Sequence, residues 1–241
     1  MSHTRDKGLV VITGGTKGIG RALTERFYRE GYSVITCSRS SEDLQHLKAE
    51  LTAEHAENSI YVHAADLSKK EDTVAFADAV KALALPVDIL INNTGIFVPG
   101  QVQTEEEGVL ERTMETNVYS AYHLTRRLLP LMLSRKQGHI FNMCSTASIT
   151  AYTNGGSYCI SKYALLGFSK VLREELKEQG IRVTAVLPGA TLTASWEGVD
   201  MPEERFMKPE DIADLLWATW LLSGRSVVEE ILIRPQLGDI G

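Results

Sequence analysis

The sequence predicts an α/β protein with a doubly wound sheet of seven parallel strands. Three observations support this prediction: β-branched runs recur at intervals, segments of helical period separate them, and most runs are apolar on both faces. Strands that lie between two layers of helices must bury both faces. Because no linker, low-complexity tract or internal repeat divides the chain, we expect a single domain spanning residues 1–241.

Each expected strand is a short β-branched run bounded by turn-forming or helical sequence. The seven runs are Leu9–Thr13, Ser33–Ser38, Ile60–Ala65, Asp88–Asn92, His139–Ser145, Arg182–Leu187 and Val227–Ile233. Their alternation with helical sequence is typical of repeated strand–helix–strand units, which build a parallel sheet.

Glycines and polar residues indicate where helices end and begin. Gly31 ends an expected helix over Ile19–Glu30, and Gly180 ends another over Tyr158–Gln179. The residues Lys208–Asp211 predict a helix start, because proline fits the first turn and acids favour the positive end of the helix dipole.

Two further helix starts are predicted from capping-box spacing. Ser68 is followed by Glu71, and Thr104 is followed by Glu107. In this motif the hydroxyl and the acid each satisfy a backbone amide of the first turn, so we expect each serine or threonine to precede a helix directly.

Composition and charge exclude several classes of protein. With 44% hydrophobic and 23% charged residues, the chain has the composition of a globular protein. Its net charge of −6, without a local basic patch, predicts no nucleic-acid partner. The apolar stretch Leu215–Leu222 is far shorter than the roughly 18 residues of a membrane span, so we expect no membrane partner.

Cysteine and histidine usage predicts a cytoplasmic protein without a metal. The three cysteines are an odd number, lie far apart, and follow no secretory leader, which favours a reduced, cytoplasmic setting. The six histidines show neither metal-ligand spacing nor a cluster with cysteine. We therefore predict no metal site.

A glycine-rich turn directly follows the first expected strand. Residues Thr13–Gly20 read TGGTKGIG, and a helical pattern follows. Gly14, Gly18 and Gly20 let the backbone approach a pyrophosphate, whose charge the helix N-terminus stabilises. A Walker-type phosphate loop is excluded because Gly18, and not serine or threonine, follows Lys17. The turn predicts a Rossmann-type dinucleotide site.

The end of the second expected strand indicates which dinucleotide is bound. An acid at this position would select the free 2′-hydroxyl of NAD, whereas an arginine would admit the 2′-phosphate of NADP. The position holds Ser38, and Arg39 follows with a planar guanidinium suited to a dianion. Lys17 adds a second positive charge from the glycine turn. These residues favour NADP(H); an ordinary exposed arginine is the alternative.

Tyr158 and Lys162 form the main candidate for catalytic chemistry. They are four residues apart in a helical segment, so both side chains project from one face. A nearby ammonium favours phenolate and lowers the phenol pKa from about 10 by about 1–3 units. Ser145, which ends an expected strand, can offer a hydroxyl to a carbonyl oxygen. No Gly-x-Ser-x-Gly sequence surrounds Ser145, which argues against a hydrolase.

Taken together, these motifs resemble those of the classical short-chain dehydrogenases/reductases over essentially the whole chain. The matching residues, in the family's order, are Thr13-Gly14-x-x-x-Gly18-x-Gly20, Asn92-Asn93-Thr94-Gly95, Asn117, Ser145, Tyr158-x-x-x-Lys162 and Pro188-Gly189-x-x-x-Thr193. Two positions depart from the family pattern, because Thr94 replaces the usual alanine and Cys144 replaces a common second serine.

The resemblance implies a catalytic tetrad of Asn117, Ser145, Tyr158 and Lys162. Ser145 would orient the substrate oxygen, and Tyr158 would be the general acid in reduction. Lys162 would bind the nicotinamide ribose and lower the pKa of Tyr158. Asn117 would hold a water that links Lys162 to solvent.

The resemblance also implies the residues that bind the cofactor. Asp66, beside Leu67, would contact the adenine, and Thr193 would contact the carboxamide. The complete expected set is Gly14, Thr16, Lys17, Gly18, Ile19, Gly20, Ser38, Arg39, Asp66, Leu67, Asn92, Gly95, Tyr158, Lys162, Pro188, Gly189 and Thr193.

The C-terminal end and one unpatterned stretch bear on the substrate. Val227–Pro235 with Gly238–Ile240 resembles the end of bacterial carbonyl reductases of the sepiapterin-reductase type. Residues 190–208 are predicted to form a lid over a bound substrate, with ordinary loop packing as the alternative. The large apolar residues of this stretch are Trp196, Met201, Phe206 and Met207.

The predicted function is NADPH-dependent reduction of a small to medium carbonyl compound, such as a ketone, a dicarbonyl or a pteridine side chain, to the alcohol. Two alternatives stay open: a 3-oxoacyl-thioester reductase and a catalytically silent NADP(H)-binding regulator on the same fold. The resemblance further implies a homodimer or homotetramer, in which dimers pack the long helices beginning near Glu105 and Tyr158.

Overall fold

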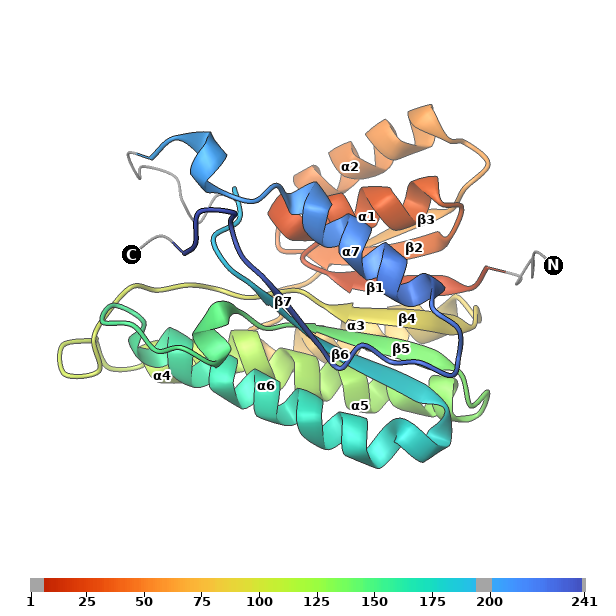
Figure 1. The fold of residues 1–241 in the computed structure, drawn as a ribbon. Helices are drawn as coiled ribbons and strands as arrows, with labels where there is room; N and C mark the ends of the chain where they lie inside the picture. The colour runs from red at the N-terminus through yellow and green to blue at the C-terminus, as the bar shows by residue number, and fades with distance from the viewer. Residues whose placement is uncertain (1–6, 194–200, 240–241) are drawn as a thin grey trace.

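Seven parallel strands form one sheet in the computed structural model, which describes residues 7–193 and 201–239. The strands are β1 (Leu9–Thr13), β2 (Ser33–Ser38), β3 (Ile60–Ala64), β4 (Val87–Asn92), β5 (Gly138–Met143), β6 (Ile181–Pro188) and β7 (Glu230–Ile233). Their order across the sheet is β3-β2-β1-β4-β5-β6-β7, which confirms the predicted doubly wound topology (Figure 1). The winding reverses between β1 and β4, where such sheets open a crevice for ligands.

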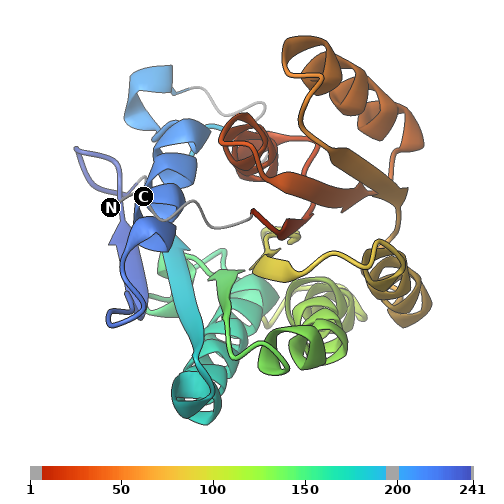
Figure 2. The same cartoon turned by 90° about the vertical axis from the view of Figure 1, so that its right-hand side faces the viewer.

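Helices cover both faces of the sheet (Figure 2). They are α1 (Gly18–Arg29), α2 (Ser41–Glu54), α3 (Lys70–Ala82), α4 (Val109–Met114), α5 (Ser120–Leu133), α6 (Gly156–Leu176) and α7 (Pro209–Leu221). One face packs against α1, α2 and α7, and the other against α3, α5 and α6. Within the described ranges, no helix has the length and apolarity that crossing a membrane requires.

The alternation of side chains along β1 explains this layering. Val10 and Ile12 pack in the cluster beneath α1, α2 and α7, whereas Leu9 and Val11 pack in the cluster beneath α3, α5 and α6. None of the four is accessible to solvent. A strand that is apolar at every position therefore holds two helical layers together.

Neither predicted capping box forms, because Ser68 and Thr104 make other local contacts, although α3 does begin close to Ser68, at Lys70. Ser68 does not cap α3, since its hydroxyl donates to Asp66 Oδ1 at 2.8 Å. Thr104 does not begin a helix, because α4 begins only after Gly108, whose φ is +86°. The start predicted at Lys208–Asp211 is confirmed by a bond from the Lys208 amide to Asp211 Oδ2 at 3.3 Å.

Several strand boundaries differ from the prediction by one residue, and the end of β5 and the start of β7 differ by more. The strand β5 ends at Met143, because Ser145 caps the short 3₁₀ turn Thr146–Ser148 and leaves the ladder. The strand β7 begins at Glu230 rather than Val227, at the point where pairing with β6 starts. Pairing and capping therefore set these ends, and hydrophobicity alone did not reveal them.

Candidate active site

The glycine turn lies at the carboxyl edge of β1 and leads directly into α1. Gly14 (φ +70°) and Gly18 (φ +52°) adopt the left-handed backbone conformation that favours glycine. A Cβ at Gly20 would lie 2.0 Å from the Gly14 carbonyl oxygen, so glycine is needed for this close approach. Among the described residues, no side chain caps the first turn of α1, and that turn holds no acid. Its amides and positive dipole end fit a pyrophosphate.

Two neighbouring asparagines after β4 have different partners. The Asn93 side chain donates to the Thr13 carbonyl at 2.9 Å, and the Asn93 backbone amide donates to Thr13 Oγ1 at 2.9 Å. These two bonds tie Asn93 to the glycine turn. The Asn92 side chain instead donates to Asn142 Oδ1 at 2.8 Å and Thr125 Oγ1 at 3.0 Å. Its side-chain nitrogen therefore serves a buried polar network, whereas Asn92 Oδ1 is buried and has no hydrogen-bond partner among the described residues.

The two predicted 2′-phosphate ligands lie near the start of α2 but in different surroundings. Arg39 is exposed at the end of β2, beside Ser38, whose hydroxyl donates to the Ser40 carbonyl at 3.1 Å. Lys17 reaches from the glycine turn to the first turn of α2 and pairs with Asp43 at 3.2 Å. The charge of Lys17 is thus partly compensated within the protein.

Asp66 follows β3 at the same corner of the sheet, with Leu67 buried beside it. Burial raises the pKa of Asp66, but hydrogen bonds from the Ser68 hydroxyl and amide and the charges of Lys69 and Arg39 hold it below its usual value. Ser38 pairs with Ala64 in the ladder of β2 and β3, so Arg39 and Asp66 follow neighbouring strand ends.

Thr193 lies directly against the glycine turn. A Cβ at Gly18 would be 2.9 Å from the Thr193 methyl group. The backbone that leads to Thr193 starts at Pro188, the last residue of β6, and the Gly189 amide donates to the Ile233 carbonyl of β7 at 2.8 Å. Thr193 therefore reaches the start of α1, whereas Gly189 stays bound to β7.

The two ends of the predicted lid, residues 190–208, are joined by backbone contacts. The Leu192 amide donates to the Met207 carbonyl at 2.9 Å, and the two segments form an isolated bridge. Phe206 and Met207 are buried, and Met207 belongs to the core cluster beneath α7, so these two side chains pack inside the protein rather than stand over a substrate. Trp196 lies outside the described residues.

Ser145, Tyr158 and Lys162 come from neighbouring elements of the same edge. Ser145 follows β5, and its hydroxyl accepts a bond from the Ala147 amide at 3.1 Å. Tyr158 lies in the first turn of α6, and the Lys162 ammonium lies 5.7 Å from the centroid of its ring. Lys162 is buried and donates to the Met143 carbonyl at 2.7 Å, which fixes its position under Tyr158.

Asn117 sits in a π-helical turn between α4 and α5. Its side chain accepts a bond from the Ile96 amide at 2.7 Å and donates to the Ile96 carbonyl and to Ser161 Oγ, both at 3.0 Å. A Cβ at Gly95 would be 3.3 Å from Asn117 Oδ1 and 3.5 Å from the Lys162 ammonium. Such π-turns are common at functional sites, and here the turn joins the loop after β4 to α6.

Sequence reasoning gave no site role to three residues that contact a predicted site residue or its direct neighbour. Asn93 binds the glycine turn, and the strict alternation of side chains along β4 is the signal that could have separated it from its neighbour. The Phe97 ring meets the Tyr158 ring edge to face, with centroids 4.9 Å apart. Glu105 binds Ser157, the residue before Tyr158. No local pattern predicts the last two contacts, because they join distant segments.

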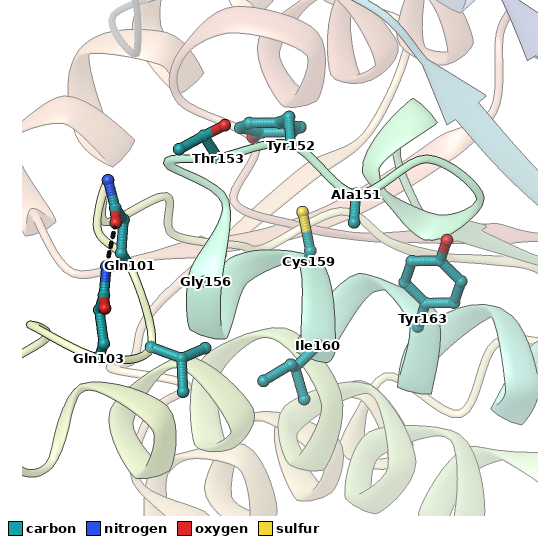
Figure 3. A pocket seen from close by; sticks show the side chains of 10 residues that line it. Gln101, Gln103, Ala151, Tyr152, Thr153, Gly156, Cys159, Ile160 and Tyr163 are labelled. Carbon is teal, nitrogen blue, oxygen red and sulfur yellow. Dashed lines mark hydrogen bonds between the residues drawn. The ribbon is translucent and has the colours of Figure 1, made fainter.

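A hollow of about 680 Å³ lies beside α6, separate from the tetrad (Figure 3). Its lining residues are Gln101, Val102, Gln103, Ala151, Tyr152, Thr153, Gly156, Cys159, Ile160 and Tyr163. Apolar groups dominate this lining, and none of the four tetrad residues is part of it. The hollow therefore belongs to the outer surface of α6 and of the segments before it.

Known proteins resemble this chain in sequence and in fold. The family model described as short chain dehydrogenase matches residues 8–204. A sepiapterin reductase of Chlorobaculum tepidum is 34% identical over 97% of this chain and 98% of its own length. An NADP-dependent 3-hydroxy acid dehydrogenase of Escherichia coli is 30% identical over 94% of both chains. The crystal structure of a metagenomic short-chain oxidoreductase in complex with NADP is 31% identical, with a TM-score of 0.82 over 95% of this chain and 96% of that one.

A glycine turn at the switch point of a doubly wound parallel sheet defines an α/β protein of the dinucleotide-binding type. The family match over residues 8–204 makes the assignment specific. The chain belongs to the short-chain dehydrogenase/reductase family, as its motifs predicted, and is an oxidoreductase acting on CH–OH or C=O groups.

Proposed function

We propose that this enzyme reduces a small to medium carbonyl compound to the corresponding alcohol with NADPH. The observation that carries the proposal is the position of Tyr158 and Lys162 on one face of the first turns of α6, with Ser145 at the neighbouring end of β5. The resemblance to a sepiapterin reductase over nearly the full chain supports a ketone, dicarbonyl or pteridine side chain as substrate.

The cofactor is NADP(H), which when bound supplies the hydride for reduction. The glycine turn and the N-terminus of α1 would hold its pyrophosphate, since they offer uncapped amides without a nearby acid. Arg39, with Lys17, would hold the 2′-phosphate. The remaining expected ligands are Thr16, Ile19, Ser38, Asp66, Leu67, Asn92, Gly95, Pro188, Gly189 and Thr193.

The protein's own residues would orient the substrate and supply the proton. The Ser145 hydroxyl would donate to the substrate carbonyl oxygen and polarise it. Tyr158 would give its phenolic proton to the same oxygen as the alcohol forms. The ammonium of Lys162 would stabilise the resulting phenolate, because an opposite charge nearby favours the ionised form. Asn117 would hold the loop after β4 in place against α6, through its bonds to Ile96 and Ser161.

The test is the Tyr158→Phe variant, assayed by NADPH absorbance on a panel of ketones, diketones, pteridines and 3-oxoacyl thioesters, with NADH as the control cofactor. We expect the rate of reduction to fall about 10²- to 10⁴-fold because the general acid is lost. The affinity for NADPH should stay close to that of the wild type. Full activity in this variant would disprove the proposed role of Tyr158.

The same panel distinguishes the alternatives. Turnover confined to 3-oxoacyl thioesters would identify the reductase of that class. Tight NADPH binding without turnover of any compound would favour a catalytically silent regulator.

We also propose that the enzyme is a cytoplasmic homodimer or homotetramer. Large apolar side chains are exposed on the outer surfaces of α5, α6 and the turn before α5, which supports packing of these helices against a second copy. They are Tyr119, Tyr122, Ile160, Tyr163 and Val171. All three cysteines are buried, unpaired thiols, as in proteins of reducing compartments.

A further inference from the structure

Glu105 reaches from the loop after β4 to the N-terminus of α6. Its Oε1 accepts a bond from the Ser157 amide at 2.8 Å, and its Oε2 accepts a bond from the Ser157 hydroxyl. The first amides of a helix have no partner within the helix and need one from elsewhere. Here a carboxylate 52 residues away provides it, at the residue that immediately precedes Tyr158.

The surroundings of Glu105 are shaped to admit this carboxylate. A Cβ at Gly156 would lie 2.0 Å from Glu105 Oε1, and a Cβ at Gly100 would lie 2.7 Å from Glu105 Cγ. Either side chain would displace Glu105. The contact therefore depends on two glycines, one from each of the segments that it joins.

The backbone joins the same two segments. The Gly100 amide donates to the Asn154 carbonyl at 3.1 Å, and Gly100 forms an isolated parallel bridge with Gly155. Both segments border the hollow in Figure 3, where Gly156 and the glutamines after Gly100 form part of the wall. Residues 100–105 and 154–157 are thus held together by backbone bonds and by one carboxylate.

The loop after β4 also touches Tyr158 itself, because Phe97 packs edge to face against its ring at a centroid distance of 4.9 Å. Glu105 fixes the backbone just before Tyr158, and Phe97 limits where the ring can lie. A phenol that must deliver a proton needs its oxygen within hydrogen-bond reach of the substrate oxygen, so small movements of this turn matter.

We propose that Glu105 is a positioning residue of the active site. By capping the first turn of α6 at Ser157, it holds Tyr158 in its position relative to Ser145. This inference rests on the proposed role of Tyr158. It predicts that loss of the carboxylate slows the proton-transfer step without weakening NADPH binding. Most of the expected cofactor ligands lie on other elements, and Lys162 is held separately by the Met143 carbonyl.

The test compares Glu105→Ala, Glu105→Gln and Ser157→Ala with Glu106→Ala as the matched control. Glu106 is the next residue of the same loop and is exposed. We expect Glu105→Ala to lower kcat at least 10-fold, with the Kd for NADPH within 2-fold of the wild type. Glu105→Gln should recover most of kcat, because its amide oxygen can still accept the Ser157 amide bond. Glu106→Ala should behave as the wild type.

Amide hydrogen exchange provides a readout that does not depend on activity. Peptides that cover the first turn of α6 should exchange at least 10-fold faster in Glu105→Ala, and peptides that cover the glycine turn should not change. In Ser157→Ala the amide bond to Glu105 is kept, so both exchange and kcat should change less. The double variant should lose no more than Glu105→Ala alone, because both changes act on one contact.

Three outcomes would overturn the inference: a kcat for Glu105→Ala within 2-fold of the wild type, an equal loss in Glu106→Ala, or a loss of kcat that only parallels a loss of NADPH affinity. If Glu105→Ala does not fold, Gly100→Ala carries the test, because its Cβ would lie 2.7 Å from Glu105 Cγ and displace the carboxylate. Unchanged kcat together with unchanged exchange in Gly100→Ala would then reject the inference. Tyr158→Phe separates this inference from the proposed function. An active Tyr158→Phe rejects the function, whereas an inactive Tyr158→Phe with an unimpaired Glu105→Ala rejects only the role of Glu105.

Discussion

Single residues at the cofactor end differ in how much of their charge is available to a ligand. Lys17 already pairs with Asp43 in the first turn of α2 at 3.2 Å. Arg39 is exposed, and it is one of two charges, with Lys69, that lower the pKa of Asp66 after the hydrogen bonds from Ser68. Arg39 should therefore contribute more than Lys17 to recognition of a 2′-phosphate.

Replacing Arg39 by alanine should raise the Kd for NADPH by about 10- to 100-fold, since a hydrogen bond to a charged group is worth about 1.5–3 kcal/mol. Lys17→Ala should have a smaller effect, because Lys17 must give up its pairing with Asp43 to bind the phosphate. The Kd for NADH should change little in either variant. Fluorescence titrations with both cofactors would measure these values, and equal weakening of NADH and NADPH would contradict the 2′-phosphate assignment.

His139 is a buried titratable residue that the proposed mechanism does not use. Its Nε2 lies 2.7 Å from Thr184 Oγ1, and its ring stacks on Phe141 at a centroid distance of 3.9 Å. The Thr184 hydroxyl donates to the Val228 carbonyl at 2.6 Å, so it must accept from Nε2–H. Nδ1 has no hydrogen-bond partner among the described residues. Burial, and next the charge of Arg182, hold the pKa of His139 well below its usual value of 6.5.

This low pKa predicts how stability depends on pH. Below about pH 6.5 the unfolded chain binds a proton at this histidine and the folded protein does not, so the free energy of unfolding falls by up to about 1.4 kcal/mol per pH unit. Above that pH the contribution is constant. His139→Leu should remove this part of the slope between pH 7 and 5, and His46→Leu, at an exposed histidine, should keep it. Urea unfolding of both variants would measure the slopes, and identical slopes would contradict the prediction.

At the scale of elements, α1 and the glycine turn act as one unit. The close approach of Gly20 to the Gly14 carbonyl sets how α1 meets the end of β1, and Asn93 fixes the same turn from the loop after β4. The position of the N-terminus of α1 relative to a bound phosphate therefore depends on the lack of a side chain at Gly20.

Gly20→Ala should destabilise the protein by about 1–3 kcal/mol, because its Cβ would overlap the backbone of the turn. It should also weaken NADPH binding at least 10-fold by displacing the amides of α1. Gly224→Ala is the matched control, since a Cβ there meets no described atom within 4 Å and should change stability by less than about 0.5 kcal/mol. Thermal unfolding and NADPH titration would test both variants. Wild-type affinity in Gly20→Ala would argue against a pyrophosphate at this turn.

At the scale of the whole molecule, the outer surface of α6 is the main candidate for contact between copies. Ile160 and Tyr163 are exposed there, and they line the hollow in Figure 3 together with Val102. Apolar side chains gathered on one face favour burial against another protein surface. The exposed helix face therefore supports the proposed homo-oligomer.

Ile160→Glu should shift the protein toward the monomer, because a carboxylate buried between two copies lacks a partner. Ala49→Glu, on the exposed surface of α2, is the control that adds the same charge elsewhere and should not change the assembly. Size-exclusion chromatography with light scattering would measure the masses. A wild-type chain that is monomeric at all concentrations would reject the proposed homo-oligomer.

The resemblance of the motifs to a known family supplied the tetrad candidates. The sequence by itself determined the order of strands and helices along the chain and the glycine turn. These features are local: a buried strand needs an apolar run, and a left-handed turn at Gly14 and Gly18 needs glycine. Lys17 and Arg39 also follow β1 and β2, the two strands whose ends the sequence predicted without error. Such signals are complete within a few residues of the chain.

Only the tertiary structure decided which polar groups meet. It paired Lys17 with Asp43, directed the Asn92 side chain to Asn142, and brought Glu105 to Ser157, where the sequence had suggested a capping box at Thr104. A carboxylate, amide or hydroxyl can satisfy many partners equally well, so its choice depends on which distant segment the packed sheet and helices place within about 3 Å of it.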